Sequence, residues 1–371
     1  MELLYAGFIL FILLLLALDL GVFHRTAHVV KVKEALGWSA VWISLGVLFT
    51  LFIYFGYEHH WFGLGTGVDA TAVARSGVNG SAIYNDGGSA AIKYLTGFVV
   101  EKSLAVDNIF VIAMIFGFLG VPAMYQHRVL FWGIVGALLL RGAMIAVGAV
   151  LIAKFSWIIY VFGGFLVVTG IKMLVVTSAA DNFDHNIFVR AVRRLFPVTE
   201  RYHGERFVVR AGSEASLAPA TPGAKVETDR VVATAKRGAL LVTPLFLALV
   251  LVEFTDVIFA VDSIPAIFAI TTDPFLVFTS NVFAILGLRS LYFALAGMVD
   301  RFKYLKVSLS VVLMVIGVKM MAHSWLKEWL GSHFNFYMLG MISLIIVTGV
   351  VASLVATRGA TKLVSPTEPS A

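Results

Sequence analysis

Nine apolar stretches, separated by polar or glycine-rich sequence, run along the chain. A helix that spans a bilayer needs about 20 mostly apolar residues. That criterion selects residues 4–23, 37–57, 92–119, 127–153, 156–177, 239–270, 276–298, 305–325 and 335–357. The pattern predicts an all-α polytopic membrane protein of about nine transmembrane helices.

Composition supports the same class of protein. Of the 371 residues, 60% are hydrophobic and only 13% are charged. Such values lie far from those of soluble domains. The chain has no cysteine, which excludes disulfides, thiolate metal ligands and thiol redox chemistry.

The distribution of basic residues predicts how the chain is oriented. Nineteen of the 28 Lys and Arg residues fall after the first, third, fifth, seventh and ninth segments. Because basic loops stay in the cytoplasm, the N-terminus is expected outside and the C-terminus inside. This asymmetry accounts for the net charge of +6, so nothing calls for a nucleic-acid partner. The first segment is expected to remain a helix, since DLGVFHR after it offers no small-residue cleavage site.

An internal repeat relates two parts of the chain. LAVDNI at 104–109 matches FAVDSI at 259–264, LLR at 139–141 matches GLR at 287–289, and GIKM at 170–173 matches GVKM at 317–320. The repeats are therefore two three-helix units, 92–177 and 239–325. An odd number of spans inverts the second unit, an arrangement that places transporter sites at the interface between repeats. Duplication without a transport role is the alternative.

The remaining divisions follow from composition. Two N-terminal helices occupy 1–57, and the small-residue-rich segment 58–91 is expected to form an extracytoplasmic loop. The cytoplasmic tail is 358–371.

The basic region 178–238 is expected to form a cytoplasmic loop. Residues 186–196 have one apolar and one arginine-rich face, which predicts a helix on anionic lipid. ERFVVRAG and RGALLVTP could pair as a short hairpin around 212–230.

Charged residues inside spans are the candidates for function. A charge at the centre of a spanning helix costs roughly 2.5–3.5 kcal/mol, so it normally faces a protein interior or a water cavity. The acids are Asp19, Glu101, Asp107, Glu253, Asp256 and Asp262, and the bases are Lys102, Arg141, Lys172, Arg289 and Lys319. The bases are expected mainly to pair charge, with Lys172 and Lys319 near enough to helix ends to snorkel. Most of the acids concentrate in two repeat-related segments.

Spacing and residue type suggest a cation site. Glu101 and Asp107, like Asp256 and Asp262, are six residues apart, or about 120° around an ideal helix. Either a broad face is used or the helix is interrupted; Pro265 favours interruption in the second unit. Carboxylate, amide and hydroxyl oxygens suit Mg²⁺, Ca²⁺ or Mn²⁺, and such acids can also exchange protons.

As a hypothesis, Asp107 and Asp262 are paired ligands at the middle of the site. The other acids complete the shell or carry protons, with neutral oxygens from Asn108 and Ser263. Asp19 closes one side.

The chain resembles the TerC family of bacterial membrane proteins, named for tellurium resistance, and most of all its Alx branch. The strings that carry the resemblance include LALDLGVFHR, EKSLAVDNIFV, YVFGGFLVVTGIK, FPVTERYHGERF, LVEFTDVIFAVDSIPAIFAIT and TSNVFAILGLR. The resemblance implies an inner (plasma) membrane protein of metal homeostasis that exports Mn²⁺, with no permanently bound cofactor. It maps the acidic motifs onto Glu101, Asp107, Asn108, Glu253, Asp256, Asp262 and Ser263, with Asp19.

The sequence departs from the family's pattern in two loops, and its function keeps alternatives open. Loop 58–91 is longer than expected, and 211–238 carries an extra Ala/Pro/Glu-rich stretch. Some members carry the label of redox modulator, for which this cysteine-free chain has no thiol. A non-transporting scaffold or stress sensor and an amino-acid exporter remain alternatives. An enzyme is not expected, because neither a YD…GxGD nor an HExxH arrangement occurs. The sequence identifies no protein partner.

Overall fold

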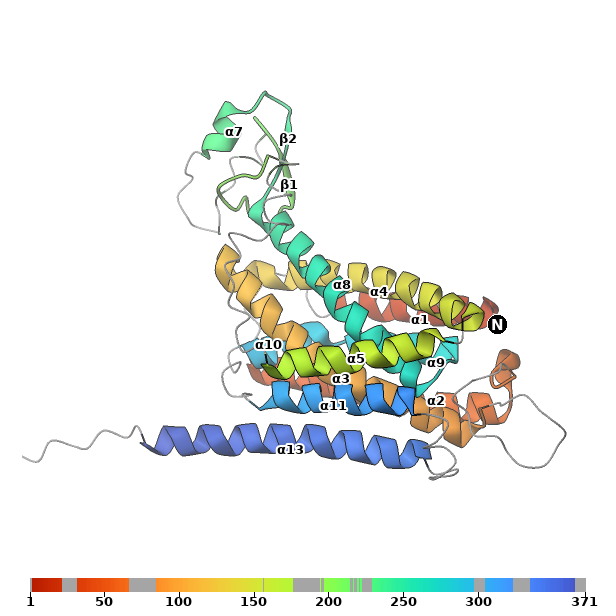
Figure 1. Cartoon of the computed structure of the whole chain (residues 1–371). Coiled ribbons are helices and arrows are strands. Elements are labelled where there is room, and N and C mark those ends of the chain that lie inside the picture. The colour runs from red at the N-terminus through yellow and green to blue at the C-terminus, as the bar shows by residue number, and fades with distance from the viewer. Residues whose placement is uncertain are drawn as a thin grey trace, which may run out of the picture.

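The computed structural model describes residues 2–21, 32–66, 85–155, 157–175, 194, 197–213, 216, 219, 221, 229–296, 304–322 and 334–363. Long helices dominate it (Figure 1). They are α1 (Glu2–Gly21), α2 (Val32–Glu58), α3 (Gly87–Leu119), α4 (Ala123–Lys154), α5 (Ile158–Val175), α8 (Pro244–Ile270), α9 (Pro274–Ile285), α10 (Leu288–Leu295), α11 (Leu305–Met321) and α13 (Phe334–Leu363). The short elements are η1 (Trp61–Gly63), α7 (Arg230–Thr234), β1 (Val208–Arg210) and β2 (Leu240–Val242).

The predicted class, an all-α polytopic membrane protein, is confirmed. Within the described residues, seven spans are long and apolar enough to cross a membrane: α2, α3, α4, α5, α8, α13 and the combined α9–α10. Glu2–Leu18 forms a shorter apolar helix, and α11 covers most of the predicted segment 305–325. The count of nine and the inverted repeat stay predictions.

Helices of the two predicted repeats interleave. α3 packs against α2, α8 and α9, and α4 packs against α8 and α9. α8 starts at the β1–β2 end of the molecule and runs away from it, whereas α3 runs the other way (Figure 1). The start of α1 and the end of α13 lie at opposite ends of the bundle (Figure 1); which end faces the cytoplasm stays a prediction.

The most extensive helix pair is α5 with α11, and glycines bring their backbones close. A Cβ on Gly170 would lie 2.8 Å from the Ser310 carbonyl oxygen, and one on Gly317 would lie 2.7 Å from that of Gly163. Gly170 and Gly317 begin the repeated GIKM and GVKM strings. Small residues of this kind allow membrane helices to pack closely.

The break in the second unit occurs in a different helix from the one predicted. Pro265 lies inside an uninterrupted α8, so of the two alternatives that the spacing left open, interruption at Pro265 does not occur. Spanning helices tolerate the lost amide because neighbouring groups satisfy the freed carbonyl. Segment 276–298, expected as one helix, instead divides into α9 and α10 at Leu286 and Gly287. Gly287 has φ 78°, and a Cβ there would lie 2.5 Å from Trp42 Cβ, so the break requires glycine.

A small module of β1, β2 and α7 projects beyond the helices (Figure 1). The predicted hairpin is present: β1 and β2 are antiparallel, with Val208 opposite Val242. The residues just before β1 contact the α3–α4 corner, where the Tyr202 hydroxyl donates to the Leu119 carbonyl at 2.8 Å. Arg128 pairs with Glu205 at 3.0 Å and lies over the Phe207 ring.

Two predicted features fall partly or wholly outside the described residues. The proposed lipid-binding helix 186–196 lies outside them, Arg194 excepted. In the loop 58–91, residues 67–84 lie outside them. α3 begins earlier than expected, at Gly87, because the Asp86 side chain caps it by accepting from the Ser89 amide at 2.7 Å.

Candidate buried cation site

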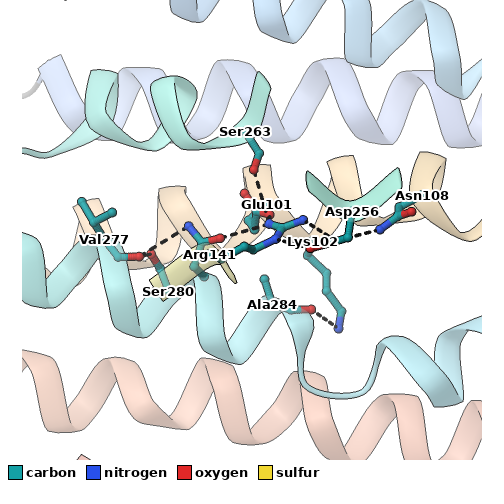
Figure 2. Close-up of polar contacts among 10 residues, drawn as sticks. Glu101, Lys102, Asn108, Arg141, Asp256, Ser263, Val277, Ser280 and Ala284 are labelled. Atoms are coloured by element: carbon teal, nitrogen blue, oxygen red, sulfur yellow. Dashed lines mark hydrogen bonds and ion pairs between the residues drawn. The ribbon is translucent and has the colours of Figure 1, made fainter. Parts of the chain in front are cut away.

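Arg141 of α4 joins carboxylates from two repeat-related helices. Its guanidinium forms an ion pair with Glu101 of α3. It also binds Asp256 of α8 through two hydrogen bonds: Nη2 donates to Oδ1 at 3.0 Å, and Nε donates to Oδ2 at 3.2 Å. All three side chains are buried. Glu101 and Asp256, which stand at matching positions of the predicted repeat, thus meet at this arginine (Figure 2).

Neutral polar groups complete the surroundings of the guanidinium. Arg141 Nη1 donates to Ser263 Oγ at 3.3 Å and to Asn281 Oδ1 at 3.1 Å. Asn108 Nδ2 donates to Asp256 Oδ1 at 3.0 Å. Each of these three polar side chains is at most 3% exposed. Figure 2 shows Arg141 between Ser263, Glu101 and Asp256, with Asn108 beyond Asp256.

Two buried oxygens beside this network have no hydrogen-bond partner among the described residues: Asn108 Oδ1 and Glu253 Oε2. The Glu253 carboxyl packs directly against Gly136 of α4, and a Cβ atom at position 136 would collide with that carboxyl. An unsatisfied buried polar atom costs about 1–3 kcal/mol, so each such atom calls for an explanation. Both oxygens are of the hard type that divalent cations bind.

Asp107 and Asp262, the predicted paired ligands, face different neighbours. Asp262 accepts a hydrogen bond from Thr169 Oγ1 of α5 at 3.3 Å and interacts electrostatically with Lys172. Asp107 interacts electrostatically with Lys306 on α11. Both side chains are only partly buried. The structure therefore places each acid toward the third helix of the other unit rather than in the Arg141 network.

Lys102 does not bond to an acid in the network although it follows Glu101. Its ammonium donates to the carbonyls of Ala284 and Leu286, both at 3.0 Å. These carbonyls lie at the α9–α10 break, where helical partners are missing. Figure 2 shows Lys102 pointing away from Arg141 toward this break, so its role is to satisfy the broken helix.

The other predicted bases have separate environments. Lys319 is buried and donates to the Ala269 carbonyl at 2.6 Å, so it does not snorkel as expected. Lys172 is exposed, and Arg289 is buried at the start of α10. The side chain of Asp19 lies outside the described residues.

Seven of the eight predicted site residues have described side chains, and these separate into a network and flanking acids. Glu101, Asp256, Asn108 and Ser263 contact one another or Arg141, Glu253 lies against α4, and Asp107 and Asp262 lie apart. In the parts of the chain that the structure describes, no three His, Cys, Asp or Glu side chains are placed to hold a metal ion. Asn281 was missed by sequence reasoning, although the polar run Thr279, Ser280 and Asn281 inside an apolar segment is a signal for it.

The fold and this network define a polytopic helical membrane protein with a buried, charged interface between α3, α4 and α8. The chain belongs to the TerC family of integral membrane proteins, whose family profile matches residues 86–361. The membership confirms the resemblance inferred from the motifs.

Relatives cover nearly the whole chain. A membrane protein of Myxococcus xanthus is 45% identical over 96% of this chain and 93% of its own length. A protein of Escherichia coli K12 named "Putative membrane-bound redox modulator Alx" is 42% identical over 86% of this chain and 85% of its own. A membrane protein of Rickettsia bellii is 37% identical over 84% of this chain and 85% of its own length. No solved structure matches the chain.

Proposed function

We propose that this chain is a membrane transporter that exports a divalent metal cation, with Mn²⁺ as the expected substrate. The observation that carries the proposal is the meeting of Glu101 and Asp256, from matching positions of α3 and α8, in a buried interface. Charges of this kind inside a membrane mark ion pathways. Transporters built from repeats place their sites at the interface between them.

The donor atoms favour a hard divalent cation. Glu101, Asp256, Ser263, Asn281 and Asn108 bring carboxylate, hydroxyl and amide oxygens. Oxygen-only sets suit Mg²⁺, Ca²⁺ and Mn²⁺, whereas softer metals prefer sulfur or imidazole. Cysteine is absent from the chain, so a redox role of the kind that the Alx name suggests would lack thiols.

Asp107 and Asp262 take a secondary place in this proposal. Each is only partly buried and faces the third helix of the opposite unit. They are suited to pass the cation, or a proton exchanged for it, between the buried network and the two membrane surfaces.

Uptake of Mn²⁺ into everted membrane vesicles under an imposed pH gradient tests the proposal. Asp256→Asn and Glu101→Gln are expected to lower uptake at least about tenfold, and Asp107→Asn and Asp262→Asn to lower it less. Glu200→Gln, an exposed carboxylate outside the bundle, is the matched control and should transport normally.

The opposite result favours a scaffold or sensor. Activity in cells that survives neutralising Glu101 and Asp256, and that fails when residues 178–237 are deleted, would contradict transport through this site. Protein abundance in the membrane is measured for every variant, so that loss of the protein is not mistaken for loss of transport.

A further inference from the structure

The oxygens that a metal would need are the oxygens that hold Arg141. Five of them meet its guanidinium: Glu101 Oε1, both carboxylate oxygens of Asp256, Ser263 Oγ and Asn281 Oδ1. Metals such as Mn²⁺ and Mg²⁺ prefer an octahedral set of oxygens. One cationic side chain therefore occupies a shell with the composition of a metal site.

We propose that Arg141 is a tethered competitor of the substrate, and that its guanidinium and a divalent cation bind Glu101 and Asp256 in turn. This inference rests on the proposed transport function and specifies how its site would load and unload. The structure corresponds to the state in which the arginine holds the site.

Charge supports an exchange rather than joint occupancy. One guanidinium opposes the two carboxylates of Glu101 and Asp256, which leaves the pair short of one positive charge. Glu101 and Asp256 are the carboxylates that pair with Arg141, whereas Glu253 lies near Asp256 but against Gly136. A divalent cation would balance the pair completely, whereas a divalent cation together with Arg141 would leave an excess positive charge on that pair, which is costly in a buried site. Binding one cation therefore favours release of the other.

Distance requires a movement between the two states. Arg141 nitrogens lie 3.0–3.3 Å from the oxygens of Asp256, Ser263 and Asn281. Metal–oxygen bonds of Mg²⁺ and Ca²⁺ are about 2.0–2.6 Å. The oxygens come from α3, α8 and α9, and the arginine comes from α4. Exchange must therefore draw α3, α8 and α9 closer together while Arg141 withdraws.

Competition predicts that removing the arginine tightens metal binding. Mn²⁺ is titrated into the purified full chain in detergent, and free Mn²⁺ is read by electron paramagnetic resonance. Arg141→Gln is expected to bind Mn²⁺ at least about tenfold more tightly than the natural chain. The double variant Arg141→Gln with Asp256→Asn should lose this increase in Mn²⁺ affinity. In vesicles, Arg141→Gln should transport more slowly, because the metal is no longer displaced.

Two further variants keep the test decisive. Lys102→Gln removes a partly buried cation whose hydrogen bonds, among the described residues, go to the carbonyls of Ala284 and Leu286, and the Mn²⁺ affinity of this variant should equal that of the natural chain. Arg141→Lys keeps the charge but loses the two-pronged grip on Asp256, so a smaller tightening is expected. If Arg141→Gln fails to fold, as judged by size-exclusion chromatography and thermal unfolding, the Mn²⁺ affinity of Arg141→Lys tests the competition instead.

The outcomes separate this inference from the proposed function. Folded Arg141 variants that bind Mn²⁺ no more tightly than the natural chain overturn the competition, whether or not vesicles transport. A natural chain that transports nothing, together with an Arg141→Gln variant that binds more tightly through Asp256, overturns transport and leaves the competition standing.

Discussion

At the scale of residues, the sequence pointed to the acids and to bases that could pair with them, Arg141 among them, but not to which acid meets which base. Six carboxylates in apolar segments are conspicuous because charge is rare there, and Glu101 and Asp256 do lie in one buried network. Helical spacing alone could not show that Asp107 and Asp262 face different helices. That arrangement depends on how α3 and α8 are rotated against α11 and α5, which is a tertiary property.

Asp256→Asn tests the energetic importance of the network. It removes the charge that Arg141 Nε and Nη2 bind, so the free energy of unfolding should fall by about 3 kcal/mol. Unfolding of the purified protein in detergent measures this. The double variant Asp256→Asn with Arg141→Gln should lose less than the sum of the two single changes; strict additivity would show that the two side chains are not coupled.

At the scale of elements, most helices were predictable because long apolar runs leave little choice in a membrane. The locations of breaks were not. Pro265 suggested a broken α8, yet the break lies at Gly287, where the close approach of Trp42 excludes any side chain. Lys102 then supplies donors to the carbonyls near the break. Neither contact has a signal in local sequence.

The glycine-mediated contact of α5 with α11 gives a prediction with a neighbouring control. A Cβ on Gly163 would lie 2.7 Å from Met321 Cγ and 3.0 Å from the Gly317 carbonyl oxygen, whereas one on Gly164 meets nothing within 4 Å. Gly163→Ala should therefore lower the free energy of unfolding by about 1–3 kcal/mol, and Gly164→Ala should be neutral or slightly stabilising. Equal thermal unfolding of the two variants in detergent would contradict the close contact.

At the scale of the whole molecule, the repeated strings of the sequence lie on helices that pack together. The third helices of the two units, α5 and α11, form the most extensive pair, and matching acids of α3 and α8 bind one arginine. The module of β1, β2 and α7 lies at the same end of the bundle as the end of α13 (Figure 1). The distribution of Lys and Arg predicts that this end is cytoplasmic.

The absence of cysteine makes this orientation simple to test. Thr66 and Ala233 are exposed; Thr66 follows α2 and η1, and Ala233 belongs to α7 in the module whose end of the bundle is predicted to be cytoplasmic. In intact cells, Thr66→Cys should react with a membrane-impermeant maleimide, while Ala233→Cys should react only after the membrane is opened. The reverse labelling would place the N-terminus in the cytoplasm and would invert the proposed direction of transport.

Direct transport by the purified protein is the most telling measurement for the whole molecule. Reconstituted in liposomes that enclose a dye quenched by Mn²⁺, the natural chain should give saturable quenching when Mn²⁺ is added outside. Glu101→Gln combined with Asp256→Asn should quench no faster than empty liposomes, at equal protein incorporation. Equal quenching by the natural chain and this double variant would contradict a cation pathway through the Arg141 network.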